Sequence, residues 1–295
     1  MPNEQFTFPS VDGREIAAYR WDPTGTPVGA AMIVHGMGEH VLRYEELAQT
    51  LNREGYVAYG HDHRGHGSSV QPGETPGDLG QDGWSALVAD IGTLAGIVRE
   101  NHADLPILLI AHSMGSFATQ QFLLDNSDRV DAVVLSGTGC LDLLEPALDL
   151  DSELDLAMFN APFAPARTDF DWLSRDEVEV DKYVADPLCG FGVDVDSVKS
   201  MFGGARRLAD PEEVARIRAD LPVLIAVGSH DPVNAGLALV TPLVDRLKAA
   251  GVEDVTLRVY ENSRHEIFNE TNRAEVFTDL VAWSGRARKP AASIG

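Results

Sequence analysis

Short apolar runs alternate with helical patterns along most of the chain. Two of these runs, Ala30–Val34 and Ile107–Ile110, are apolar at every position, as expected of strands covered on both faces. The expected strands are Ala30–Val34, Tyr56–Tyr59, Ile107–Ile110, Val130–Leu135, Pro222–Val227 and Val255–Val259. The expected helices lie at residues 40–54, 84–98, from Met114 onward, 236–250 and 276–281. Because strands and helices alternate, the pattern predicts an α/β fold with a mostly parallel central sheet flanked by helices.

The alternation breaks between residues 139 and 210. This segment is rich in Asp, Pro, Phe and Leu and shows no clear strand. We therefore expect a core made of residues 1–138 and 211–295, interrupted by a helical cap at residues 139–210. An insertion at this point would lie over the carboxyl ends of the strands, where open α/β sheets bind ligands.

Composition and charge narrow the possible partners. The chain has 295 residues, of which 44% are hydrophobic and 23% charged, as in ordinary globular proteins. With 23 basic and 46 acidic residues, the net charge of −23 disfavours binding to nucleic acid. Apolar runs such as Ile107–Ala111 are far shorter than the roughly 20 residues that span a bilayer, so no stable membrane insertion is expected.

The first residues and the cysteine content bear on the location of the protein in the cell. The first residues, MPNEQFTFPS, lack the basic start and apolar core of a signal peptide. Two cysteines, Cys140 and Cys189, are too few for a disulfide framework and lack metal-binding spacing. We expect a cytoplasmic protein with free thiols, and the sequence leaves its oligomeric state open.

The segment around Ser113 carries the strongest chemical signal. A buried strand leads into Ser113 and a helix leaves it, with Ala111 two residues before and Gly115 two residues after. A serine on a tight strand-to-helix turn needs small neighbours, and the turn presents its hydroxyl at the positive end of the helix. Ala111 replaces the glycine of the usual G-x-S-x-G pattern and is still small. The pattern predicts a nucleophilic serine.

Two further residues complete a plausible mechanism for that serine. Asp231 follows a late strand, and His265 follows the last strand, so all three side chains are expected at one edge of the sheet. The chain order Ser, Asp, His is the order of this kind of fold. Backbone N–H groups of Met114 and Met37 are the expected donors to the oxyanion formed during acyl transfer.

Five motifs now carry a family resemblance: HGMGEH (35–40), GHDHRGHGSS (60–69), AHSMGS (111–116), GSHDPVN (228–234) and SRHE (263–266). Together they resemble the α/β-hydrolase family, within it the monoacylglycerol lipase and lysophospholipase-like branch. The resemblance implies Ser113, Asp231 and His265 as catalytic triad, Met37 and Met114 as oxyanion donors, and a helical cap. It implies a cofactor-independent serine hydrolase whose substrate is a small acyl ester such as a monoacylglycerol.

Other functions stay open at this stage. A lactonase, amidase or peptidase would share the triad, and a receptor with slow turnover would share the fold. A zinc site at His61, His63 and His66 is disfavoured because Gly65 stands where a metal-binding Asp would be expected. We expect Asp62 and Arg64 to pair within that loop instead.

Aromatic residues in the insertion are candidates for the wall of an acyl pocket. Phe159, Phe163 and Trp172 lie in the expected cap. Packing within the cap explains them equally well from the sequence alone.

Overall fold

A computed structural model describes residues 1–152, 154 and 156–287. Its centre is a single eight-stranded sheet with the strand order β1-β2-β4-β3-β5-β6-β7-β8. The strands are β1 (Glu4–Pro9), β2 (Glu15–Trp21), β3 (Gly29–Val34), β4 (Tyr56–His61), β5 (Ile107–His112), β6 (Ala132–Ser136), β7 (Val223–Gly228) and β8 (Val255–Tyr260). From β4 to β8 all neighbours are parallel, which confirms the α/β fold predicted from the alternating pattern.

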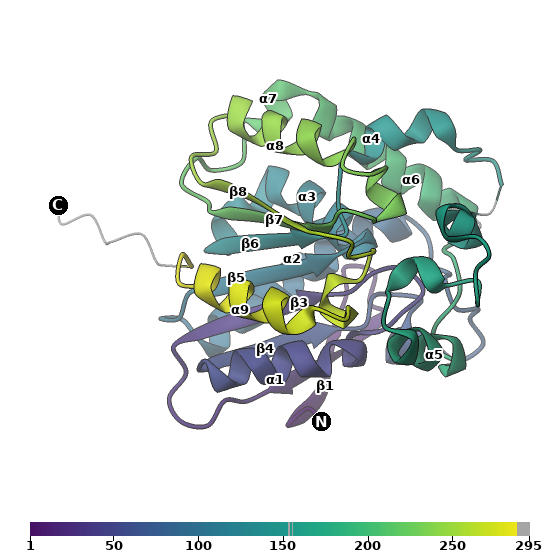
Figure 1. The fold of residues 1–295 in the computed structure, drawn as a ribbon. Helices are drawn as coiled ribbons and strands as arrows, with labels where there is room; N and C mark the ends of the chain where they lie inside the picture. The colour runs from purple at the N-terminus through teal and green to yellow at the C-terminus, as the bar shows by residue number, and fades with distance from the viewer. Residues whose placement is uncertain (153, 155, 288–295) are drawn as a thin grey trace.

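Helices cover both faces of this sheet (Figure 1). One face packs against α1 (Glu45–Arg53) and α9 (Arg273–Ser284), and the other against α2 (Gly83–Asn101), α3 (Met114–Asn126) and α8 (Val240–Ala249). The two faces form separate hydrophobic clusters. Both are needed because a parallel strand buries both of its faces.

Strand β5 shows how its sequence divides between the two clusters. Ile107 and Leu109 belong to the cluster with α2 and α3, and Leu108 and Ile110 belong to the cluster with α1 and α9. Side chains alternate across a strand, so an uninterrupted apolar run supplies both faces at once. This arrangement fixes the strand firmly, and its carboxyl end leads directly into Ser113.

The first two strands were not predicted from the sequence. Strand β1 pairs with β2, and β2 pairs with β4, both in antiparallel fashion. Only Phe8 of β1 is buried, because β1 is an edge strand with most of its side chains toward solvent. Its mixed composition therefore gives a weak strand signal.

Between β6 and β7 the described part of the chain forms only helices and turns, and residues 139–210 of it are called the inserted segment here. Its helices are α4 (Leu141–Leu144), α5 (Glu177–Ala185) and α6 (Val195–Ala205), and α7 (Pro211–Val214) follows directly. Its 3-10 helices are η4 (Glu145–Ala147), η5 (Leu156–Phe163), η6 (Asp171–Leu173) and η7 (Arg206–Ala209). The remaining 3-10 helices are η1 (Val41–Tyr44), η2 (Gly67–Ser69), η3 (Ser127–Arg129), η8 (Pro232–Asn234) and η9 (Ile267–Asn269).

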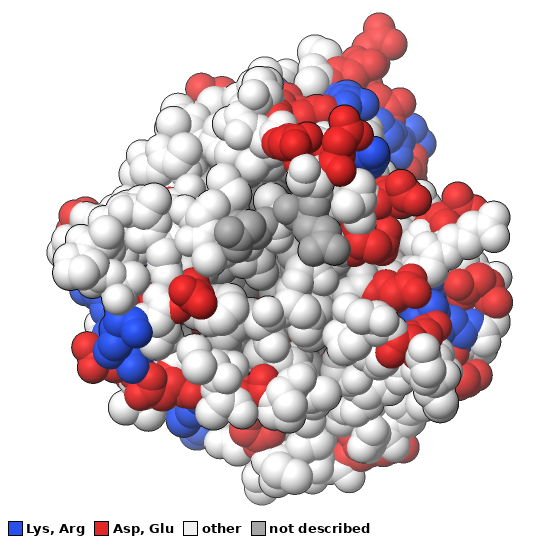
Figure 2. Space-filling model, turned by 90° about the vertical axis from the view of Figure 1, so that its right-hand side faces the viewer, with Lys and Arg blue, Asp and Glu red and all other residues white. Residues whose placement is uncertain are grey.

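The inserted segment lies along one end of the sheet, at the right of Figure 1. Seen from that end, much of the surface lacks charged side chains, and acidic groups gather toward its edges (Figure 2). Among the described residues, no helix is both long and apolar enough to cross a membrane.

Candidate active site

Ser113 lies at the sharp turn between β5 and α3. Its backbone has φ +50° and ψ −123°, a conformation that costs free energy for any residue with a side chain. The turn is also crowded, since a Cβ on Gly115 would lie 2.4 Å from the carbonyl oxygen of His35. The small residue predicted at position 115 is therefore required by a close backbone approach.

Asp231 and His265 are brought together by the loops after β7 and β8. His265 Nδ1 lies 2.9 Å from each carboxylate oxygen of Asp231, and both side chains are buried. Asp231 also accepts a hydrogen bond from the N–H of Val233 at 2.9 Å, which fixes the carboxylate. This contact orients the imidazole, so that Nε2 is the nitrogen left for chemistry.

The Nε2 atom of His265 is buried and has no hydrogen-bond partner among the described residues. It belongs to a cavity that Ser113 also lines. Burial lowers the pKa of His265, but the charge and hydrogen bond of Asp231 outweigh burial and raise the pKa above its ordinary value. The same pairing would stabilise an imidazolium formed during proton transfer.

Two backbone N–H groups beside Ser113 are also available. Neither Met37 nor Met114 has a hydrogen-bond partner for its N–H among the described residues, and both residues line the cavity. Met114 is the first residue of α3, where a helix leaves its N–H groups unpaired. Free donors at this place suit a developing oxyanion.

The cavity has an apolar part and a polar part. Its empty volume, including the open mouth, is about 660 Å³. The apolar lining comes mainly from α3 and the inserted segment: Phe117, Leu141, Leu144, Leu148, Leu154, Leu156, Phe159, Trp172, Leu173, Met201 and Phe202. The polar lining includes Glu39, Tyr183 and Glu266. Such a lining suits a ligand with a long apolar tail and a compact polar group.

A buried ion cluster forms the polar part, and the sequence analysis missed it. Arg43 donates hydrogen bonds to Glu39 and to both carboxylate oxygens of Glu266, at 2.6 and 2.7 Å for the latter. Glu39 Oε1 accepts further hydrogen bonds from the N–H of Gly36 at 2.6 Å and from the hydroxyl of Tyr44 at 2.7 Å. The i, i+4 spacing of Glu39 and Arg43, directly after the HGMG turn, is the signal that was available.

The pKa values of the two carboxyl groups in this cluster are shifted in opposite directions. Burial raises the pKa of Glu39 despite Arg43. Glu266 is equally buried, but its two-point contact with Arg43 lowers its pKa to about 2. Two carboxylates thus share one guanidinium, and none of the three charges is left without a partner.

Of the histidines at 61, 63 and 66, two contact backbone groups, and His61 is buried with neither ring nitrogen hydrogen-bonded among the described residues. His63 Nε2 lies 3.0 Å from the carbonyl oxygen of His35, and His66 Nε2 accepts a hydrogen bond from the N–H of Gly38 at 3.1 Å. Among the described residues, three ligand atoms gather within 4.8 Å in two other groups, His40–Asp186–Cys189 and Glu39–His112–Glu266. Geometry therefore gives the zinc hypothesis at residues 61–66 no support.

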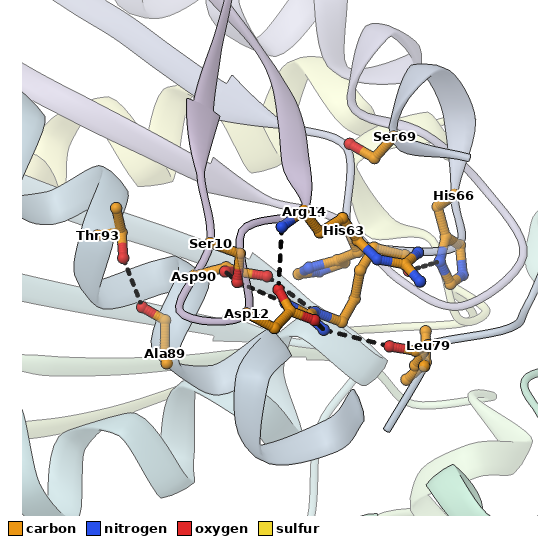
Figure 3. A network of polar contacts seen from close by, with 12 residues as sticks. Ser10, Asp12, Arg14, His63, His66, Ser69, Leu79, Ala89, Asp90 and Thr93 are labelled. Atoms are coloured by element: carbon orange, nitrogen blue, oxygen red, sulfur yellow. Dashed lines mark hydrogen bonds and ion pairs between the residues drawn. The ribbon is translucent and has the colours of Figure 1, made fainter. Parts of the chain in front are cut away.

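The predicted pairing of Asp62 with Arg64 is wrong. Arg64 is fully buried and donates to Asp90 at 3.0 Å and to Asp12 at 3.0 Å. These two carboxylates are labelled in Figure 3. Asp62 instead accepts hydrogen bonds from the N–H groups of Val41 and Ser68, at 3.0 and 2.8 Å. Arg64 finds carboxylates on β1–β2 and α2, which the local sequence does not reveal.

The three aromatic residues predicted for the pocket differ in position. Phe159 and Trp172 line the cavity, and the Trp172 ring lies 5.0 Å from that of His265. Phe163 is not among the described lining residues, and the guanidinium of Arg264 lies 4.2 Å over its ring. Phe163 therefore packs against the loop of His265 from outside the cavity, which corrects its expected place.

Comparison with known proteins adds an independent finding. Residues 25–272 match the model of a family described as serine aminopeptidase, S33. The chain belongs to this family of hydrolases. It is 33% identical over 286 residues to a monoacylglycerol lipase of Mycolicibacterium smegmatis, covering 95% of this chain and 96% of that protein. It is 30% identical to the monoglyceride lipase of Rattus norvegicus, covering 88% of this chain and 83% of that protein.

Solved structures agree with this assignment. A thermostable carboxyl esterase from Bacillus coagulans, in complex with glycerol, has a TM-score of 0.86 at 25% identity, covering 98% of this chain and all of that one. A monoacylglycerol lipase of Paleococcus ferrophilus has a TM-score of 0.69 at 25% identity, covering 93% of this chain and all of that one. The predicted resemblance to the monoacylglycerol lipase branch of the α/β-hydrolases, and the expectation of a hydrolase, are confirmed.

Proposed function

We propose that this protein hydrolyses monoacylglycerols and similar small acyl esters through a Ser113–His265–Asp231 triad. The observation that carries the proposal is the buried Nε2 of His265, which has no partner among the described residues and shares a cavity with Ser113. The other nitrogen of the same ring is held by Asp231. The relatives named as monoacylglycerol and monoglyceride lipases support the choice of substrate.

The reaction follows from these positions. His265 Nε2 accepts the hydroxyl proton of Ser113 as Oγ attacks the ester carbonyl, and Asp231 stabilises the resulting imidazolium. The N–H groups of Met37 and Met114 donate to the oxyanion. His265 then protonates the departing alcohol, and it later takes a proton from the water that releases the fatty acid.

The two parts of the cavity fit the two parts of a monoacylglycerol. The apolar wall from α3 and the inserted segment suits the acyl chain, so the inserted segment serves as a cap. The polar part at Glu39, Tyr183 and Glu266 suits the hydroxyl groups of the alcohol. The proposed substrate is a small molecule, and cytoplasmic location belongs to the same proposal.

A peptidase activity is the second candidate, because the family description names an aminopeptidase. An aminopeptidase must bind a free ammonium group, for which an unpaired carboxylate is the usual partner. Glu39 and Glu266 both already pair with Arg43. This arrangement favours an uncharged alcohol over an ammonium group.

The test is a substrate panel measured with wild type and Ser113→Ala side by side. It contains monoacylglycerols and p-nitrophenyl esters from C2 to C16, lysophospholipids, lactones and aminoacyl p-nitroanilides. We expect the highest kcat/KM on monoacylglycerols, and none of these activities in Ser113→Ala. Faster cleavage of anilides or lactones would contradict the proposal, and binding with a single burst and no turnover would favour a receptor.

A further inference from the structure

A backbone loop, Gly36–His40, carries the proposed oxyanion donor Met37 and contacts the inserted segment. Tyr183, on α5, donates a hydrogen bond from its hydroxyl to the carbonyl oxygen of Gly38 at 2.8 Å. The N–H of Gly190 donates to the same oxygen at 3.0 Å. His40 Nε2 lies 3.0 Å from a carboxylate oxygen of Asp186. Three contacts thus join this loop to the stretch from 183 to 190.

Two further hydrogen bonds fix the same loop, one within it and one from the segment after β4. Glu39 accepts the hydrogen bond of the Gly36 N–H at 2.6 Å, and His66 Nε2 accepts that of the Gly38 N–H at 3.1 Å. The peptide groups on both sides of the Gly36–Met37 peptide are therefore fixed. The N–H of Met37 is left between them without a partner among the described residues.

The loop and the inserted segment are closely packed at Gly38. Gly38 has φ +63°, and a Cβ at this position would lie 2.3 Å from the carbonyl oxygen of Phe191. Tyr183 is buried, with the guanidinium of Arg43 4.7 Å from its ring centre and the ring of Phe170 at 4.9 Å. The hydroxyl of Tyr183 is consequently held in one place, and it fixes the Gly38 carbonyl in turn.

We propose that Tyr183 is a positioning residue that acts through Gly38 to hold the Met37 N–H toward the oxyanion. The inserted segment then sets the geometry of the reaction as well as lining the cavity. This inference rests on the proposed function, because it needs Met37 to act as an oxyanion donor. A donor displaced by a fraction of an ångström loses much of its effect on the transition state while substrate binding changes little.

Tyr183 also lines the cavity, so direct contact with the substrate is the competing explanation. Its single hydroxyl proton is already used by the Gly38 carbonyl, so toward a substrate it can only accept a hydrogen bond. A contact of that kind would matter for the hydroxyl groups of a glycerol ester. It would not matter for a p-nitrophenyl ester of the same acid.

The experiment compares Tyr183→Phe with Tyr56→Phe. Tyr56 is a matched control, because its buried hydroxyl also donates to a backbone carbonyl, that of Ser284 at 3.2 Å, and Tyr56 does not line the cavity. Both variants are assayed with the monoacylglycerol and the p-nitrophenyl ester of one fatty acid. The inhibition constant of an alkyl trifluoromethyl ketone, which forms a tetrahedral adduct with a serine, is measured as well.

Removing an oxyanion donor outright costs about 10²–10³ in kcat, so an indirect displacement should cost about tenfold. For Tyr183→Phe we expect kcat to fall about tenfold on both esters, with KM changed less than twofold. The ketone should bind about tenfold more weakly. Tyr56→Phe should leave kcat, KM and the affinity for the ketone unchanged, while it lowers Tm by about as much as Tyr183→Phe does.

Each other outcome overturns the inference. A loss confined to the monoacylglycerol, with unchanged ketone affinity, would assign Tyr183 to direct substrate contact. Unchanged kcat on both esters would show that the Gly38 contact has no role in the reaction. If wild type neither cleaves these esters nor binds the ketone, the proposed function fails and this inference fails with it.

Discussion

The sheet side and the inserted-segment side of the cavity are built differently. On the sheet side, charged groups such as Glu39, Arg43 and Glu266 are almost fully buried, and each makes several hydrogen bonds. The inserted segment contributes mainly apolar side chains from short helices, and some of its large residues remain exposed, as Leu143 at 46% and Met158 at 45% do. Proton transfer and charge development need a fixed polar frame, whereas an acyl chain needs only apolar contact. Changes on the sheet side should therefore alter rate, and changes to the apolar side chains of the inserted segment should alter selectivity.

The largest expected effect on the sheet side is that of Ser113→Ala. The change removes the attacking oxygen and leaves a turn whose strain comes from its backbone, so turnover should fall by about six orders of magnitude, to the detection limit. A fluorophosphonate probe should label wild type on Ser113 and leave the variant unlabelled.

Ser127→Ala is the matched control, because Ser127 lies just beyond the other end of α3, is buried, and accepts a hydrogen bond from the N–H of Arg218 at 3.0 Å. It should keep full labelling and activity. Labelling of a different serine in wild type would disprove the assignment of the nucleophile.

The next effect concerns Asp231 and the pH dependence of the rate. Only neutral imidazole accepts the serine proton, and Asp231 raises the pKa of His265. The kcat/KM of wild type should thus rise with pH through a midpoint above the ordinary histidine value of about 6.5. In Asp231→Asn, burial remains and the opposing charge is gone, so the midpoint should move to lower pH while the maximal rate falls by about 10⁴.

A profile of kcat/KM from pH 5 to 9 with a p-nitrophenyl ester measures both quantities. An unchanged midpoint in Asp231→Asn would mean that a group other than His265 is the base. Chelators should leave the wild-type profile unchanged, whereas loss of activity with EDTA, restored by zinc, would revive the metal hypothesis at residues 61–66.

Glu39→Gln tests the polar frame around Gly36 and leaves the three residues of the triad in place. The amide keeps an acceptor for the Gly36 N–H but loses the charge shared with Arg43, so we expect kcat to fall about tenfold with little change in KM. Unfolding should become easier by about 1–3 kcal/mol, because a buried charge-assisted contact is weakened.

Asp131→Asn supplies the comparison for that variant. Asp131 accepts the N–H of Ile107 at 2.8 Å and pairs with Arg99 at 2.7 Å, at the other end of β5. It should lose a similar amount of stability, measured by urea unfolding, with unchanged kcat. Equal loss of kcat in both variants would show that rate follows overall stability and not the frame around Gly36.

The smallest expected effect belongs to the inserted segment. Phe159→Ala enlarges the apolar part of the cavity. Each methylene of the acyl chain that gains or loses apolar contact is worth about 0.8 kcal/mol, or about fourfold in kcat/KM. The preferred acyl chain should lengthen by a few carbons while the rate of fluorophosphonate labelling stays the same. Phe163→Ala, in the same helix but packed on Arg264, should leave chain preference unchanged. If the preferred chain length changed equally in both variants, or in neither, the cavity wall at Phe159 would not determine chain selectivity.

Trp172 stands between the two regions. Its ring belongs to the wall and also lies 5.0 Å from the ring of His265. Substitutions at Trp172 should therefore change labelling rate as well as chain preference.

The sequence predicted best those features that depend on local patterns. The six strands from β3 to β8 have strong apolar runs or clear alternation, and Ser113, Asp231 and His265 each follow one of them. The edge strand β1 was missed because few of its side chains are buried, and the antiparallel strand β2 beside it was missed as well. The 3-10 helices of the inserted segment follow no period long enough to detect.

Contacts between distant residues were the least predictable part of the site. Glu266 and Arg43 are 223 positions apart, and in the sequence each resembles an ordinary surface charge. Tyr183 and Gly38 are 145 positions apart, and nothing near either residue indicates the other. The pairing predicted for Arg64 was wrong for the same reason. Its carboxylate partners, Asp90 and Asp12, lie far from it in the sequence, whereas Asp62 is only two positions away.

The double attachment of the inserted segment has a consequence for protein engineering. One part of it bonds the loop of His265 and Glu266, where Leu173 accepts the Glu266 N–H at 2.7 Å, and another part bonds Gly38. If the corresponding segment of a relative were grafted here, the chimaera would gain new selectivity and stay active only under two conditions. A carbonyl group must again accept the N–H of Glu266, and a hydroxyl group must again donate to the carbonyl oxygen of Gly38. Libraries that diversify the leucines and Phe159 while keeping Tyr183 and the backbone at 172–173 should consequently yield more active variants than wholesale exchange of residues 139–210.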